Sequence, residues 1–164
     1  MRDLSAWAIR AVTPQRESRL VLRVLEIWRE AHGENDLPLT GSIAIADFGL
    51  DAPHVFVLDV EAPADPQFSV IGPAVSVAGW PGSEAPLLAT CPDDSVLAQV
   101  AQHWREIVER RVPVTRGGIG VNEGTPILYR GILMPLIDEK QRVCRVIGAA
   151  NWRAVEESHG ARSN

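Results

Sequence analysis

Cysteine is scarce in this sequence, and its two copies do not form a recognisable motif. Cys91 and Cys144 lie far apart in a chain of 164 residues, and no Cys-x-x-Cys pair occurs. We therefore expect two reduced thiols rather than a disulfide. The histidines also stand at spacings that no metal-binding motif uses, so we expect no metal site. They are His32, His54, His103 and His159.

Long apolar runs and clustered positive charge are absent too. No stretch approaches the roughly 20 apolar residues that a membrane-spanning helix needs, and the N-terminus shows no signal-peptide pattern. The net charge is −5 and the basic residues are scattered, whereas a nucleic-acid-binding protein presents a clustered basic face. These absences predict a soluble, cytoplasmic protein that neither inserts into a membrane nor binds nucleic acid.

The familiar catalytic signatures are missing as well. The glycine-rich run Thr115–Gly120 lacks the Lys-Ser/Thr pair and the following helix of a phosphate-binding loop, and no kinase or hydrolase motif occurs. We expect this run to begin a flexible or bulged strand. A dispersed acid/base pair such as His54 and Asp59 would leave no spacing to detect. A small enzyme is therefore the least favoured hypothesis, and we expect no enzymatic activity.

Apolar residues recur at three- and four-residue steps after Thr13-Pro14, which is the pattern of an amphipathic helix. The Thr-Pro pair predicts its start and Gly33 its end. The apolar stripe must be buried either on the chain's own sheet or against a second copy, and the sequence leaves both alternatives open. The residues that would form the seam of a homodimer are Leu20, Val24, Leu25 and Trp28.

A second amphipathic pattern, over residues 96–108, predicts one long helix. Asp93 or Asp94 would cap its start. Pro113 would stop it, because the residue before a proline avoids the helical region. Residues 73–92, which precede this helix, contain four prolines and predict irregular structure with short helical turns.

Five segments rich in β-branched and aromatic residues, bounded by turn residues, predict strands. Two form a hairpin in the first half of the chain, and three form a meander near its end. Residues 43–51 are ambiguous between a short helix and a strand. The predicted strands are His54–Glu61, Gln67–Gly72, Val112–Val121, Pro126–Ile137 and Arg142–Trp152.

The last hairpin resembles the closing hairpin of a PAS domain. Its first strand ends on Met134-Pro135-Leu136-Ile137, a polar loop led by aspartate follows at Asp138–Gln141, and the apolar return strand is Val143–Gly148. One departure is Gln141, which stands where a glycine is often found. The hairpin is expected all the same, with its turn type left open.

Two further segments extend the resemblance. Phe68–Gly72 and Val24–Ala31 resemble the second strand and the leading helix of short single-domain PAS proteins of proteobacteria, and the matching elements together cover residues 16–153. The resemblance implies an α+β fold, with a PAS-like five-stranded antiparallel sheet, helices on one face and an N-terminal amphipathic helix. Residues 1–15 would then be an N-terminal extension and residues 154–164 a polar tail.

The resemblance also implies a function. In PAS domains the cavity between sheet and helices often holds a small ligand, and dimers form through the sheet or the leading helix. We therefore expect a stand-alone cytoplasmic sensory or interaction module of bacterial signal transduction that binds a small ligand or a partner signalling protein. The alternative is a ligand-free PAS-fold adaptor or dimerisation protein with a filled core. The sequence does not identify a cofactor.

The residues that would line such a cavity come from the second helix and the last two strands. Tyr129 and Arg130 alternate along a strand, so one of them should face the helices and the other should face away. The ligand-pocket candidates are Leu97, Ala101, His103, Trp104, Tyr129, Arg130, Leu133 and Ile147.

Overall fold

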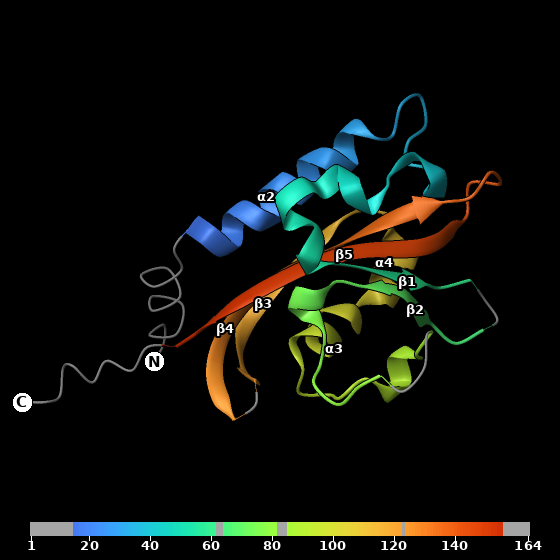
Figure 1. Cartoon of the computed structure of the whole chain (residues 1–164). Coiled ribbons are helices and arrows are strands. Elements are labelled where there is room, and N and C mark those ends of the chain that lie inside the picture. The colour runs from blue at the N-terminus through green and yellow to red at the C-terminus, as the bar shows by residue number, and fades with distance from the viewer. Residues whose placement is uncertain (1–14, 62–63, 82–84, 123, 156–164) are drawn as a thin grey trace, which may run out of the picture.

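The computed structural model of the chain describes residues 15–61, 64–81, 85–122 and 124–155 (Figure 1). Five strands form one antiparallel sheet, in the order β2-β1-β5-β4-β3. The sheet confirms the predicted fold class, with five strands close to the predicted segments. The strands are β1 (Val55–Asp59), β2 (Gln67–Ile71), β3 (Val114–Asn122), β4 (Thr125–Ile137) and β5 (Val143–Ala154).

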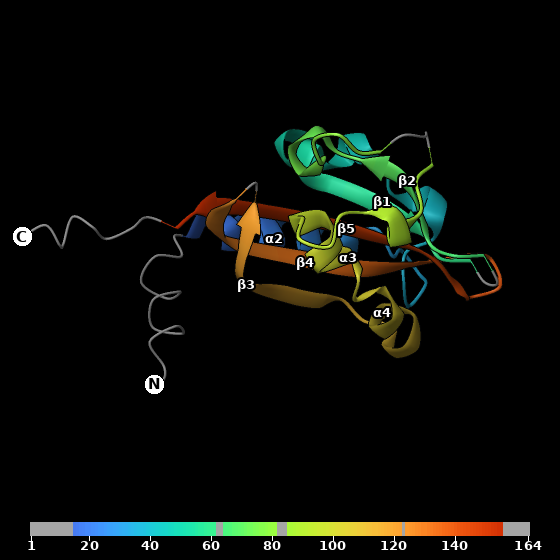
Figure 2. The ribbon, with the colours of Figure 1, turned by 90° about the horizontal axis from the view of Figure 1, so that it is seen from below.

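Helices cover both faces of this sheet. Helix α2 lies across one face, and α3 and α4 lie on the other, as Figure 2 shows from below. The α-helices are α2 (Gln15–Glu30), α3 (Val96–Ala101) and α4 (Trp104–Arg110), and the short 3-10 helices are η1 (Thr40–Ser42), η2 (Ile45–His54), η3 (Pro73–Val75) and η4 (Leu88–Thr90). No helix among the described residues is long and apolar enough to cross a membrane.

Helix α2 buries its apolar stripe on the chain's own sheet. Leu20, Val24 and Trp28 are buried there, and Leu25 is half-buried beside them. Trp28 Nε1 donates a 2.9 Å hydrogen bond to the carbonyl of Pro135 in β4. The stripe is therefore covered by the chain's own sheet. The predicted Thr13-Pro14 cap lies outside the described residues.

One predicted helix differs from the sequence-based expectation, and one ambiguous segment is resolved. The single long helix is interrupted at Gln102-His103, so that α3 and α4 are separate, and its cap is Ser95 rather than an aspartate. Ser95 Oγ accepts a 3.1 Å hydrogen bond from the Ala98 N–H. Apolar periodicity specifies which face is buried but not the direction of the axis, so the interruption leaves no signal. Residues 43–51, which were ambiguous, fall largely within η2.

Pro135 lies near the end of β4, just before an irregularity in the pairing with β5 between Leu136 and Ile137. The pairing of β3 with β4 ends at Val114 and Leu133, so β4 has only one neighbour, β5, at the position of the proline. A proline cannot donate to a ladder and is tolerated where one side of the strand is free. A proline in a strand is expected at an edge or a bulge, and Pro135 has one free strand side and an adjacent irregularity.

Candidate functional site

The space between α3 and the sheet is where a PAS-like ligand would be expected. Three of the pocket candidates meet there, and each of them is almost completely buried: Leu97, Ala101 and Leu133. They pack in one cluster with Phe56 and Phe68 from the first hairpin. These three candidates thus converge on one place, but as members of a continuous apolar core.

Two glycines show how tightly this interior is filled. A Cβ atom at Gly148 would lie 2.4 Å from Phe56 Cζ and 2.8 Å from Leu133 Cδ2, and one at Gly131 would lie 2.7 Å from a methyl carbon of Val100. Distances this short mean that the Phe56 ring and helix α3 rest directly on the backbone of β4 and β5. Side chains of the protein itself therefore occupy the space over these two strands.

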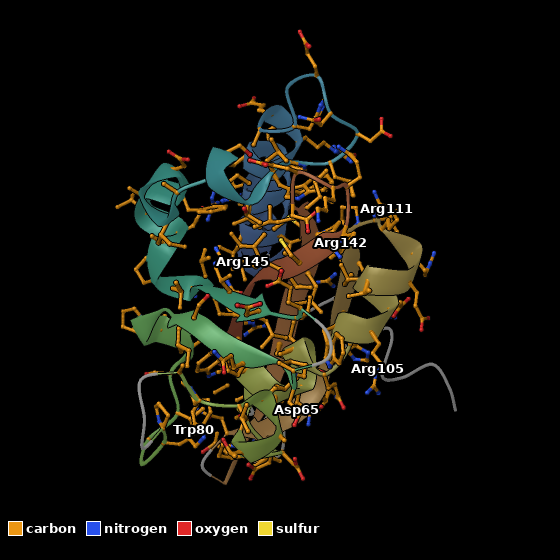
Figure 3. All side chains as sticks on the ribbon, turned by 90° about the vertical axis from the view of Figure 1, so that its right-hand side faces the viewer. Asp65, Trp80, Arg105, Arg111, Arg142 and Arg145 are labelled. Atoms are coloured by element: carbon orange, nitrogen blue, oxygen red, sulfur yellow. The ribbon has the colours of Figure 1, made fainter. Side chains whose placement is uncertain are left out.

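A row of aromatic rings extends the core toward the irregular segment. Phe56 and Phe68 meet edge to face with centroids 6.1 Å apart, and Phe68 and Trp80 do the same at 5.8 Å. Trp80 Nε1 then donates a 3.1 Å hydrogen bond to Thr90 Oγ1, near the start of α3. Trp80, labelled in Figure 3, comes from the proline-rich part of the chain. These contacts explain why that part is packed rather than solvated.

Tyr129 and Arg130 face opposite sides of the sheet. The ring of Tyr129 lies on the α3 side, where it would meet Cβ atoms placed at Gly118 and Gly120 at distances of 3.6–3.7 Å. Arg130, the next residue along β4, consequently lies on the α2 side. Ile147 also packs in the core beneath α2. Arg130 and Ile147 are therefore separated by the sheet from the other pocket candidates, which corrects their grouping.

His103 and Trp104 lie at the rim of the core, around the interruption between α3 and α4. Trp104 packs against the core from outside, and the guanidinium carbon of Arg105 lies 4.9 Å from its ring centroid (Figure 3). Burial lowers the pKa of His103, the charge of Arg116 lowers it further, and Glu106 opposes both effects. The fold thus favours the neutral imidazole at this position.

Glu106 of α4 connects that helix to β3. Its carboxylate accepts a 2.7 Å hydrogen bond from Arg110 and another hydrogen bond from Arg116 of β3. Desolvation acts to raise the pKa of Glu106, but the hydrogen bonds and charges of the two arginines outweigh it, so the pKa is lowered. This cluster orders the surface between α4 and β3.

The dispersed acid/base pair considered from the sequence is not brought together. His54 precedes the start of β1 and Asp59 ends it, so about 16 Å of extended chain separates them. His54 Nδ1 lies 3.1 Å from the carbonyl oxygen of Ala150 instead. Among the described residues, no group of three or more histidine, cysteine, aspartate or glutamate side chains could hold a metal ion.

Both cysteines are buried and unpaired in the structure. Cys91 Sγ lies 3.4 Å from Ser95 Oγ. Burial raises the pKa of the Cys91 thiol and of the Cys144 thiol. Neither has the exposed, acidified character of a reactive thiol.

A pocket that the sequence-based candidates missed opens at the rim of the sheet. It has a volume of about 330 Å³ and lies between η3, the start of α3 and the ends of β3 and β5. The irregular segment supplies much of its wall, and an irregular segment has no periodicity from which a wall could be predicted. Its lining includes Val75, Val77, Asp94, Ser95, Asn122 and Trp152.

A second, larger groove lies at the other end of the sheet. It has a volume of about 650 Å³ between η1 and the loop that joins β4 to β5. The loop is held by Asp138, whose Oδ1 accepts hydrogen bonds from the N–H groups of Lys140 and Arg142, at 2.8 and 2.9 Å. Gln141 in the same loop has a φ of 68°. Its carbonyl accepts a 2.9 Å hydrogen bond from Arg111, which is labelled in Figure 3. The missing glycine is thus replaced by a glutamine in the left-handed conformation.

Comparison with known proteins gives resemblances at the level of the fold. No protein-family model matches the sequence, and no curated protein matches it. Solved structures that resemble it are PAS and LOV domains. The PAS domain of BvgS from Bordetella pertussis is 13% identical over 67% of this chain and 81% of that chain, with a TM-score of 0.39. The LOV domain of the blue-light photoreceptor Aureochrome1, in its dark structure, is 13% identical over 68% of this chain and 82% of its own, with a TM-score of 0.44.

A third resemblance is to an RNA-binding light-oxygen-voltage receptor. It is 20% identical over 66% of this chain and 33% of that chain, with a TM-score of 0.41. Because all three TM-scores are below 0.5, the PAS-like fold is assigned from the antiparallel five-stranded sheet of the chain itself.

Proposed function

We propose that this chain is a sensory or interaction module of bacterial signal transduction, without catalysis of its own, that acts in the cytoplasm by contact with a partner protein. The resemblance of its closing hairpin and leading helix to short PAS proteins of proteobacteria supports the class of module. The filled interior supports protein contact over an internal ligand.

The observation that carries the proposal is the position of the Phe56 ring over Gly148. Small-molecule sites generally need a concave space of roughly 300–1,000 Å³. Between α3 and the sheet, that space is taken by Phe56, Val100 and Leu133, each of which is almost completely buried. A ligand there would have to displace core side chains and forgo their packing energy.

Native and denaturing mass spectra of the freshly purified chain, with an absorbance scan of the same sample, test the proposal. We expect the mass of the 17.9 kDa chain, or of an oligomer of it, with nothing lost on denaturation and no visible chromophore. A small molecule that is released on denaturation, and that a Leu133→Trp substitution excludes, would contradict the filled interior.

A second candidate is a small-ligand sensor that uses the pocket at the rim. The volume of this pocket, about 330 Å³, is within the range of small-molecule sites. Its lining combines apolar side chains with the polar groups of Asp94 and Asn122. In that case the bound mass would be lost in a Ser76→Trp variant, which fills the pocket. It would be retained in a Ser42→Trp variant, whose substitution lies in the groove at the other end of the sheet.

A further inference from the structure

The two edges of the sheet differ in how they are covered. Along β2, the segment after the first hairpin provides partners: the Phe68 N–H donates to the Pro86 carbonyl at 2.8 Å, and the Leu88 N–H donates to the Pro66 carbonyl at 2.9 Å. Along the outer side of β3, which forms the other border of the sheet (Figure 2), no backbone partner occurs among the described residues. Within the described part of the chain, the β3 edge thus lacks a partner strand, and its Thr115 carbonyl accepts a 2.9 Å hydrogen bond from the Arg116 side chain.

Strand β3 also lacks the features that usually prevent edge strands from pairing. It pairs with β4 in unbroken register, from Val114 opposite Leu133 to Asn122 opposite Thr125, without a bulge. It contains no proline and no lysine, and its one charged side chain, Arg116, is bound by Glu106. A long, regular edge strand without such protection is a template for another strand.

Apolar side chains on this strand are exposed on the α2 side of the sheet. Ile119 is 58% exposed and Val121 is 45% exposed, although both belong to a regular strand. Thr115 and Gly117, which precede them at every second position of the strand, are exposed on the same face. Apolar groups on an open edge indicate a surface that is covered in the assembled state.

We propose that β3 pairs antiparallel with β3 of a second copy, centred on Gly118, so that the two five-stranded sheets join into one. The inference rests on the proposed function, since it assigns one contact surface to a module that works through protein contacts. A pairing of identical strands is isologous, and the same edge must supply both halves of every contact.

The sequence of β3 is complementary to itself in this register. Ile119 lies opposite Gly117 of the other copy, and Val121 lies opposite Thr115, so that an isoleucine side chain covers a glycine and two β-branched side chains meet. On the other face, Arg116 lies opposite Gly120. The nine residues of β3 all find a partner, because Gly118 is their midpoint.

Charge favours the same register. The two Arg116 side chains would be separated by four residues along the strands, about 13 Å, which exceeds the screening length of roughly 8 Å at physiological ionic strength. A register centred on Arg116 itself would place like charges directly opposite each other, which is destabilising. This self-complementarity favours a second copy over an unrelated strand as the occupant.

The test is the oligomeric state of the full chain, measured by native mass spectrometry and light scattering. We expect a dimer, and we expect an Ile119→Lys variant to be monomeric and still cooperatively folded, because the substituted side chain is exposed in the single chain and only the stabilisation from association is lost. A Leu50→Lys variant is the matched control, since Leu50 is 98% exposed and far from β3 in sequence, and it should remain dimeric.

A disulfide test reads the register directly. In a Thr115→Cys/Val121→Cys variant, the new cysteine at position 115 of one copy faces the new cysteine at position 121 of the other. Their Cα atoms would be about 4.5–5.5 Å apart, which suits a disulfide. Within one chain the two positions are about 20 Å apart. Mild oxidation should therefore give a covalent dimer, whereas Thr115→Cys alone should give none.

The outcomes separate this inference from the proposed function. A monomeric wild-type chain, or a dimer that persists in the Ile119→Lys variant, would overturn the β3 pairing. Both results would leave the proposed ligand-free module intact, because bound small-molecule mass decides that question. Conversely, released ligand in a β3-paired dimer would overturn the filled interior and leave the pairing in place.

Discussion

Gly148 and Gly131 allow the Phe56 ring and helix α3 to approach the backbone of the sheet closely. Each glycine lies in a central strand, and in each case a side chain occupies the position that a Cβ would take. The strand sequence shows only that small residues are present. Which side chain closes over them depends on parts of the chain that are remote in sequence, so this part of the candidate site could not be predicted.

Replacing Gly148 by alanine should destabilise the protein by about 2–3 kcal/mol. The new methyl group would overlap the Phe56 ring, and overpacking of a dense core typically has a cost of this order. Urea denaturation followed by fluorescence measures the change. Gly41→Ala is the control, because a Cβ at Gly41 meets nothing within 4 Å, and it should be nearly neutral. A Phe56→Leu/Gly148→Ala pair that is fully additive would contradict the contact.

Replacing Gln141 by glycine should stabilise the protein by about 0.5–1 kcal/mol. Gln141 adopts a φ of 68°, where a side chain is strained and glycine is not, although the gain is reduced by the greater freedom of glycine in the unfolded chain. The free energy of unfolding in urea checks this. Lys140→Gly, one residue earlier and without a positive φ, should instead be destabilising. Equal effects of the two substitutions would show that φ at 141 does not matter.

The helices illustrate where periodicity is sufficient and where it is not. The apolar stripe of α2 could be predicted to be buried, but its partner could not, because a stripe fits the chain's own sheet as well as a second copy. In the structure the Trp28 indole reaches the Pro135 carbonyl, a partner on the chain's own sheet. The interruption between α3 and α4 also follows from tertiary packing, since Gln102 and His103 are not helix-breaking residues.

Two leucines of α2 provide a matched test of this packing. Leu20→Ala should destabilise the protein by about 3 kcal/mol, because Leu20 is fully buried against the sheet. Leu22→Ala should change stability by less than about 0.5 kcal/mol, because Leu22 is 63% exposed. Denaturant unfolding of both variants measures the difference. Similar losses from the two substitutions would mean that α2 buries a different face.

For the molecule as a whole, three lowered pKa values predict a loss of stability in acid. Burial lowers the pKa of His103 from 6.5. The pKa of Glu106 is lowered from 4.5 and that of Asp138 from 3.8, the latter chiefly by the hydrogen bond from the backbone N–H of Arg142. In all three cases the unfolded chain binds protons more readily than the folded one. The free energy of unfolding should therefore fall as the pH falls.

The contribution of His103 to this loss of stability can be isolated, because histidine takes up its proton at a higher pH than the carboxylates do. The wild-type chain should become less stable as the pH falls below about 6.5, and a His103→Asn variant should lose that part of the decline and keep the part at lower pH. Urea midpoints at a series of pH values provide the measurement. His32→Asn replaces an exposed histidine as the control. An unaltered pH profile in the His103 variant would contradict this assignment.

The amino-acid order was enough to predict the five strands, the leading helix and the closing hairpin. Alternating and three- to four-residue patterns and turn residues are local properties, and each can be recognised without knowing what lies opposite. Tertiary structure alone placed Ile147 and Leu133 on different faces, filled the interior with Phe56 and left β3 without a second partner strand among the described residues. These features depend on which elements become neighbours and how closely their backbones approach, which is decided by packing between segments far apart in the chain.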